Sequence, residues 1–178
     1  MLTAHPSTPN GAVRSLGVQL RTEEPGILVF QYLLDADMSR VRVPQSGAGG
    51  RADALWKSTC FEAFVAPADE PGYHEFNFSP SLDWAIYQFT AYREGMRAAA
   101  IGRDPDISVR QGVDGLELRS AVHLGDLAAL RDARHVRIAP AAVIEDENGR
   151  LSYWALRHPP GKPDFHQPTG FTLEVARP

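Results

Sequence analysis

The sequence has a single cysteine, no long apolar run and no excess of basic residues. One thiol cannot form an intramolecular disulfide or a multi-thiolate metal site, so a reducing, cytoplasmic location is expected. No apolar run approaches the roughly 18 residues of a membrane-spanning helix, and the amino terminus lacks the pattern of a secretory signal. Lys and Arg number 18 against 22 Asp and Glu, a net charge of −4 that disfavours nucleic acid and anionic membranes as partners.

The composition that remains is that of an ordinary globular domain. The chain has 178 residues, of which 43% are hydrophobic and 22% charged, enough to build one core without disulfides or metals. Residues 1–12 are polar and carry proline and glycine, so we expect a flexible amino-terminal tail. Residues 13–178 show no linker and are predicted to form a single domain.

Short apolar runs separated by turn residues favour strands over helices along most of the chain. The Asn148-Gly149 pair predicts a tight hairpin turn, and residues 123–130 are the best helix candidate. Residues 102–115 carry glycine, aspartate and proline and are expected to form a loop. This pattern predicts an all-β, antiparallel sandwich with at most one short helix. The predicted core comprises Phe30, Phe61, Phe76, Phe78, Tyr87 or Phe89, and Val143.

The segment 73–79 alternates between aromatic and polar side chains. Phe76 and Phe78 point to one face of the predicted strand, and Glu75 and Asn77 point to the other. If the strand containing Glu62 lies beside this one, all three polar side chains share a face. Such a sheet is aromatic on the core side and either solvated or ligand-binding on the other.

Three stretches hold all the tryptophans and most of the unusual polar residues: LWKSTCFEAFV, YHEFNFSPSLDWAIYQFTAYREGM, and YWAL with HPPGKPDFH. In these stretches the chain resembles a family of small bacterial proteins with a DOMON-like domain, a superfamily that includes the family-nine carbohydrate-binding modules. The resemblance runs from about Val18 to Val175 and implies an immunoglobulin-like β-sandwich. It further implies that a sugar or haem binds on one sheet or at its rim. The sugar-binding relatives clamp the sugar between tryptophans.

Nine residues supply the group types that recognise a small polar ligand, namely flat rings, carboxyls, an amide, a guanidinium and imidazoles. These candidate ligand-binding residues are Trp56, Glu62, Glu75, Asn77, Arg93, Trp154, His158, Asp164 and His166.

Several of these nine residues have a structural role as the alternative to ligand binding. Trp56 sits beside a strand and is expected in the core. Trp154 alternates with Tyr153, so one of the two faces outward. Glu62 is expected to form an ion pair, with Arg93 as a candidate partner, more readily than to face a ligand.

Further alternatives concern the polar row and the loop near the carboxyl terminus. Glu75 and Asn77 are interpreted first as a solvated sheet face. The residues His158, Asp164 and His166 share one proline-rich loop, which either forms the rim of a ligand site or, less favoured, binds a divalent metal.

The function that these observations favour is a non-catalytic binding module for a small polar ligand, most readily a carbohydrate. The main alternative is a glycosidase-like enzyme that uses Glu62 and Glu75 as a carboxylate pair. A haem-binding or protein-interaction domain is a third interpretation. The sequence is also compatible with a homo-oligomer. No cofactor or metal is expected for the leading hypothesis, with haem and a divalent metal as the alternatives.

Overall fold

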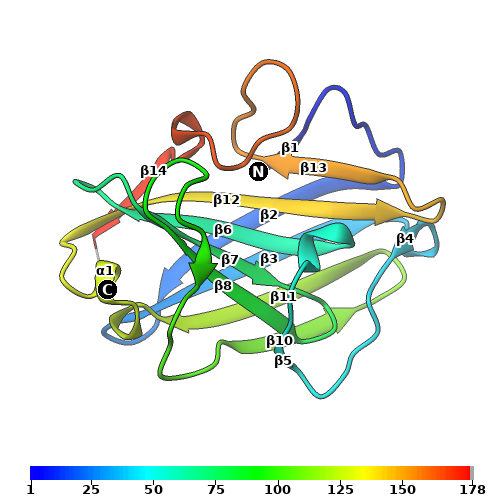
Figure 1. Ribbon diagram of the computed structural model, residues 1–178. Helices are drawn as coiled ribbons and strands as arrows, with labels where there is room; N and C mark the ends of the chain where they lie inside the picture. Colours follow the sequence, from blue (N-terminus) through cyan, green and yellow to red (C-terminus); the bar gives the residue numbers. More distant parts are fainter. Residues whose placement is uncertain (177–178) are drawn as a thin grey trace.

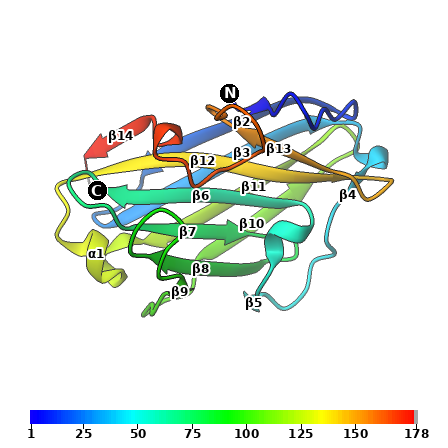
Figure 2. The same ribbon diagram turned by 45° about the horizontal axis from the view of Figure 1, so that its top comes forward.

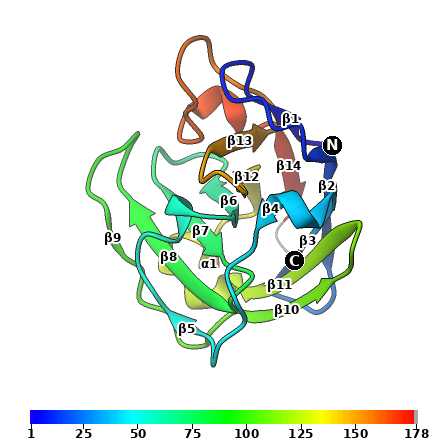
Figure 3. The same ribbon diagram turned by 90° about the vertical axis from the view of Figure 1, so that its right-hand side faces the viewer.

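Two β-sheets lie face to face in the computed structural model, which describes residues 1–176 (Figures 1 and 3). The larger sheet has ten strands with the main order β1-β13-β12-β6-β7-β8-β5, and the smaller has four in the order β10-β11-β3-β2. All pairings are antiparallel except the short contact between β5 and β8. The predicted all-β sandwich is confirmed.

The larger sheet takes its strands from nearly the whole length of the chain. Its strands are β1 (Thr3–Ala4), β4 (Val41–Arg42), β5 (Gly50–Arg51), β6 (Cys60–Pro67), β7 (Tyr73–Phe78), β8 (Asp83–Phe89), β9 (Arg97–Ala98), β12 (His135–Asp146), β13 (Leu151–Ala155) and β14 (Leu173–Ala176). Figure 2 shows β6, β7 and β8 side by side, with β12 on the other side of β6.

The smaller sheet and the helical turns complete the molecule. The strands are β2 (Val13–Thr22), β3 (Ile27–Ala36), β10 (Asp106–Gln111) and β11 (Gly115–His123). The helical turns are η1 (Met38–Arg40), η2 (Leu55–Lys57), η3 (Leu124–Asp126), α1 (Ala128–Arg131) and η4 (Pro168–Gly170). The helix predicted at residues 123–130 is thus divided between η3 and the four-residue α1.

The core lies between the two sheets, where alternate residues of each strand point inward. Phe76 and Phe78 of β7 are fully buried, and their rings lie 6.3 and 5.9 Å from the ring of Phe30 on β3. Phe61 of β6 is also fully buried. These four predicted core residues are confirmed.

The larger sheet also has a second apolar cluster on its outer face, away from the smaller sheet. Phe64, Tyr73, Tyr87 and Phe89 belong to it, together with several alanines. The prediction placed one of Tyr87 and Phe89 in the core, but both are buried in this outer cluster. Loops therefore cover an outer face that strand alternation alone would leave to water.

The amino-terminal residues lie against the edge of this sheet. Thr3 and Ala4 pair with β13, and the buried Leu2 donates its backbone N–H to the carbonyl of Leu16 at 2.8 Å. Residues 2–4 are therefore anchored to the domain. The flexibility predicted for residues 1–12 concerns motion, and it stays a prediction.

The prediction of a loop at residues 102–115 was wrong for the middle of this segment. Residues 106–111 form β10, which pairs along its length with β11. Ile107 and Val109 alternate with polar residues and pack against the core, a period-2 pattern that marks a half-buried edge strand. Within residues 1–176, no helix is long and apolar enough to cross a membrane.

Candidate functional site

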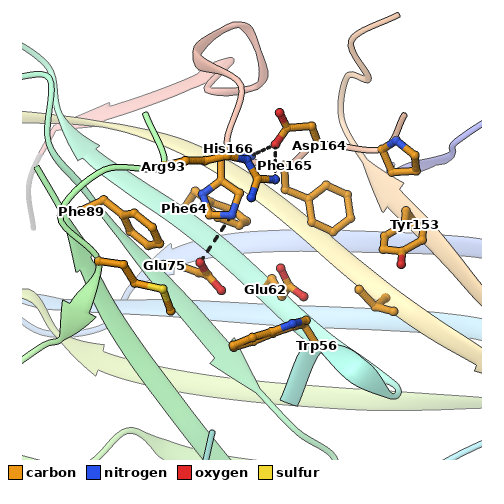
Figure 4. Close-up of a pocket in the computed structure, with 13 residues that line it drawn as sticks. Trp56, Glu62, Phe64, Glu75, Phe89, Arg93, Tyr153, Asp164, Phe165 and His166 are labelled. Carbon is orange, nitrogen blue, oxygen red and sulfur yellow. Dashed lines mark hydrogen bonds and ion pairs between the residues drawn. The ribbon is translucent and has the colours of Figure 1, made fainter. Parts of the chain in front are cut away.

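A cavity of about 310 Å³ opens on the outer face of the larger sheet (Figure 4). We call it the outer-face cavity. Its floor consists of outward-pointing strand side chains: Glu62 and Phe64 of β6, Glu75 of β7, Phe89 of β8, Val143 of β12 and Tyr153 of β13. Val143, predicted for the core, is buried but faces this cavity.

The walls come from three connecting segments that rise above the sheet. Trp56 belongs to the helical turn η2, and Arg93 and Met96 belong to the connection between β8 and β9. The long loop after β13 supplies the rest, residues 163–166. Figure 4 shows Trp56 on the opposite side of the two glutamates from Arg93, Asp164 and His166.

Left-handed backbone marks two of these wall segments. Ala54, two residues before Trp56, has φ of 62°, and Arg93 has φ of 55°. Such conformations in residues other than glycine cost roughly 1 kcal/mol or more each and tend to cluster at ligand sites. This conformational strain lies at the two turns that place Trp56 and Arg93 in the cavity wall.

Glu62 lies on the floor of the cavity with only 3% of its surface exposed. Its Oε1 atom is buried and has no hydrogen-bond partner among residues 1–176. Burial, and then repulsion by Glu75, raises the pKa of Glu62 well above its usual value. The predicted ion pair with Arg93 was wrong, because the guanidinium of Arg93 binds Asp164 instead.

Glu75 is held by its neighbours. Its Oε1 accepts a hydrogen bond of 2.8 Å from the amide of Asn77, and its Oε2 lies 3.7 Å from Nε2 of His166. Burial raises the pKa of Glu75, opposed by the hydrogen bond from Asn77 and by the charge of Arg93. The interpretation of Glu75 and Asn77 as a solvated face was wrong: 5% of Glu75 and none of Asn77 is exposed.

His166 is neutral at physiological pH. Burial, together with the nearby charge of Arg93, lowers its pKa to about 4. The hydroxyl of Tyr73 lies 2.8 Å from Nδ1 and accepts a hydrogen bond from the backbone N–H of Arg93. The direction of the hydrogen bond between Tyr73 and His166 depends on which ring nitrogen carries the proton of the neutral imidazole. The contact of 3.7 Å is a polar contact rather than an ion pair.

The charges of Arg93 and Asp164 compensate each other at the rim. A guanidinium nitrogen of Arg93 lies 2.7 Å from Oδ1 of Asp164, and the hydroxyl of Tyr92 donates to Oδ2. Partial burial works in the opposite direction, but the hydrogen bonds from Tyr92 and Arg93 lower the pKa of Asp164. About half of the Arg93 side chain remains exposed, and the residue lines the cavity.

Six of the nine predicted ligand-binding residues line this one cavity. They are Trp56, Glu62, Glu75, Arg93, Asp164 and His166. The expectation that Trp56 lies in the core was wrong, since it is only partly buried and borders the cavity. The assumed pairing of the strands that carry Glu62 and Asn77 is confirmed, because these two residues are direct partners.

The other three lie elsewhere. Asn77 is sealed beneath the floor, where it holds Glu75. Trp154 points into the core and donates its indole N–H to Ser152 at 3.0 Å, so its neighbour Tyr153 is the one that faces outward. His158 lies at the amino-terminal strand, where Nε2 is 2.8 Å from the carbonyl oxygen of Thr3.

The metal interpretation of the proline-rich loop gains no support from this placement. His158 makes an edge contact with His5, whereas His166 lies against Phe64 and Tyr73. Among residues 1–176 no group of three or more His, Cys, Asp or Glu is placed to hold a metal ion.

The sequence interpretation missed the apolar part of the site. Phe64, Phe89 and Tyr153 form the floor with the glutamates, and Phe165 and Met96 form part of the wall. Strand alternation contained a signal for the first, since Phe64 lies two residues after Glu62 and shares its face. No local pattern places the wall residues over the sheet.

Glu62→Gln is expected to stabilise the protein at neutral and alkaline pH. The folded state binds the Glu62 proton more tightly than the unfolded state, so the parent loses stability as pH rises above about 4.5 through the raised pKa. Gln cannot titrate, so the stability advantage of the variant should grow across this window and then level off. We expect a gain of about 1–2 kcal/mol at pH 8. Urea denaturation of both proteins from pH 4.5 to 8 measures it, and an advantage that shrinks with pH would contradict the burial of this carboxyl.

Comparison with known proteins supports the fold. No family model matches the chain, and no curated protein matches it. A solved structure from Bacteroides uniformis, described as "a putative carbohydrate-binding protein", is similar with a TM-score of 0.65 and 15% sequence identity. The similarity covers 93% of this chain and 79% of the other. At this identity the likeness establishes a shared β-sandwich fold.

Proposed function

We propose that this protein is a carbohydrate-binding module whose ligand site is the outer-face cavity. The observation that carries the proposal is the combination of aromatic walls with Glu62, a buried carboxyl that has an unpartnered oxygen at the cavity floor. The similarity to a protein described as carbohydrate-binding agrees with it.

Sugars present flat C–H faces and a rim of hydroxyl groups. Aromatic rings bind the faces, and a few fixed polar groups bind the hydroxyls. Trp56, Phe64 and Phe165 offer the apolar surfaces, while Glu62 and Glu75 offer acceptors and Arg93 a donor. The site thus has the composition that a small sugar requires.

The size of the cavity limits the ligand. About 310 Å³ is at the lower end of the roughly 300–1,000 Å³ typical of small-molecule sites. We therefore propose a monosaccharide, or the terminal unit of a longer glycan whose remainder stays outside the mouth.

Calorimetric titration with a panel of hexoses, pentoses and short oligosaccharides tests the proposal. At least one sugar should bind with a dissociation constant between roughly 10 µM and 1 mM. Trp56 serves as an optical reporter, because Trp84 and Trp154 are both buried in the core between the sheets. The same sugar should therefore change tryptophan fluorescence, and a panel without heat or fluorescence change at about 10 mM would contradict carbohydrate binding.

A glycosidase is the second candidate, favoured by the pair of buried carboxyls. Glu62 pairs with Asn77 in the β6–β7 register, which makes Glu75 its diagonal neighbour. Diagonal residues have backbone positions roughly 7–8 Å apart, which allows their carboxyl groups to reach the spacing of roughly 5–10 Å found in catalytic pairs. A raised pKa such as that of Glu62 suits a general acid. Release of nitrophenol from aryl glycosides, lost in Glu62→Gln, would favour the enzyme over the binding module.

A further inference from the structure

The outer-face cavity holds two buried carboxyls, and within residues 1–176 no unpaired Lys or Arg side chain lines it. The Oε1 atom of Glu62 is buried and has no hydrogen-bond partner within residues 1–176. The carboxyl of Glu75 accepts a hydrogen bond from the neutral amide of Asn77 and lies 3.7 Å from the neutral ring of His166. Among the described residues 1–176, Arg93 is the one Lys or Arg side chain that borders the cavity, and it is paired with Asp164.

We infer that the cavity binds an amino sugar, with its ammonium group held between the carboxylates of Glu62 and Glu75. This inference rests on the proposed sugar-binding function and names the substrate class of the same site. Both carboxyls face the same enclosed space, so a cation that balances their charge has to enter the cavity (Figure 4).

The positions of the two glutamates suit one shared donor group. They are diagonal neighbours on β6 and β7 and both line the cavity, so their flexible side chains can turn toward one group bound there. An ammonium has three N–H donors and one positive charge, whereas a sugar hydroxyl offers one donor and no charge. Only the ammonium satisfies the free oxygen of Glu62 and also relieves the repulsion between the carboxyls.

The surrounding rings favour the same charge. Aromatic faces attract ammonium groups electrostatically when the cation lies within about 6 Å of the ring centre. Trp56, Phe64, Phe89 and Phe165 all line the cavity with the glutamates. An acidic floor with aromatic walls therefore favours an amine over a hydroxyl or an acetamide at this position.

The protonation of the site follows from the groups that face Glu62 from each packed element. Glu75 faces it from β7, Cys60 lies two residues away on β6, and the hydroxyl of Tyr32 on β3 donates to its backbone carbonyl. Around the cavity, Tyr153 lies on β13, Arg93 follows β8, and Asp164 and His166 come from the loop after β13. None of these groups places an unpaired cation beside Glu62.

Binding of the ammonium should release a proton from the carboxyl pair. Before binding, burial and mutual repulsion favour a proton on the pair. The ammonium replaces that proton, which passes to the buffer, and both carboxyls become charged acceptors. Affinity should consequently fall as the solution is made more acidic, since protons then compete with the amine.

The experiment compares glucosamine, galactosamine and mannosamine with their N-acetyl derivatives and parent hexoses. Calorimetry at pH 7 in two buffers of different ionisation enthalpy measures both affinity and proton release. At least one amino sugar should bind about tenfold more tightly than its neutral counterparts and release a proton. In Glu62→Gln this preference should disappear, with folding verified by thermal denaturation. Glu24→Gln, which removes an exposed carboxyl in the turn between β2 and β3, should retain it.

The outcomes separate this inference from the proposed function. If neutral hexoses or N-acetyl derivatives bind as tightly as the amines, the ammonium inference is wrong and sugar binding stands. If an amino sugar is preferred without proton release or without dependence on Glu62, the placement between the carboxylates is wrong. If no sugar of any kind binds at about 10 mM, both fail.

Discussion

Phe76→Ala is expected to destabilise the protein by about 3–5 kcal/mol. Phe76 is fully buried at the centre of β7, where its ring lies 6.3 Å from Phe30 and 6.2 Å from Phe78. Removing the ring leaves a cavity between two sheets that cannot collapse without shifting whole strands, so most of the packing energy is lost. Urea denaturation followed by circular dichroism measures the change.

The control for this variant is Phe76→Leu, which keeps most of the volume and should cost less than about 2 kcal/mol. Phe76 points away from the outer-face cavity, so the fraction of Phe76→Ala that remains folded should bind ligand as the parent does. A loss below about 1 kcal/mol for the alanine variant would be inconsistent with a core packed between the two sheets.

Trp56→Ala is expected to weaken sugar binding by about thirtyfold to a hundredfold, or roughly 2–3 kcal/mol. The indole forms one wall of the cavity and rests edge-on against Tyr87, with 5.8 Å between ring centres. Tyr87 is in turn fixed by a hydrogen bond of 2.6 Å from its hydroxyl to Asp53. The ring is therefore pre-positioned, and little conformational entropy is lost when a sugar packs on it.

Calorimetry with the best sugar of the panel measures this loss. Trp56→Phe, which keeps a flat ring, should bind with intermediate affinity. Trp56 is only partly buried and lies on a short helical turn, so its truncation should destabilise the fold less than Phe76→Ala does. Unchanged sugar affinity in the alanine variant would place the ligand somewhere other than the outer-face cavity.

Strand alternation carried most of the prediction of the fold. The sequence around β7 separated Phe76 and Phe78 from Glu75 and Asn77, and the structure places the first pair in the core and the second on the outer face. Alternation is a local property, because successive side chains of an extended chain point to opposite sides whatever lies further away. The alternation in β10 was overlooked, because the glycine, aspartate and proline residues around this strand favoured a loop.

The candidate site was predicted in part, since six of nine residues meet in one cavity. The errors concern partners that lie far apart in the chain. Arg93 forms an ion pair with Asp164, which lies 71 residues away in the chain, and Glu62 is left without the cation that was expected beside it. Trp154 and Tyr153 alternate, and only the packing of β13 against the core determines which of them faces outward.

The amino-acid sequence by itself determined most of the strands, the two faces of β6 and β7, and the polar groups that line the cavity. The tertiary structure alone decided that the outer face is covered, because the loops that carry Trp56, Arg93 and His166 meet over the sheet only after the strands have paired. That meeting depends on contacts between residues distant in the chain, which no local period encodes. It also set the electrostatics of the site, since the pairing of Arg93 with Asp164 leaves the enclosed Glu62 without the cation expected from the sequence.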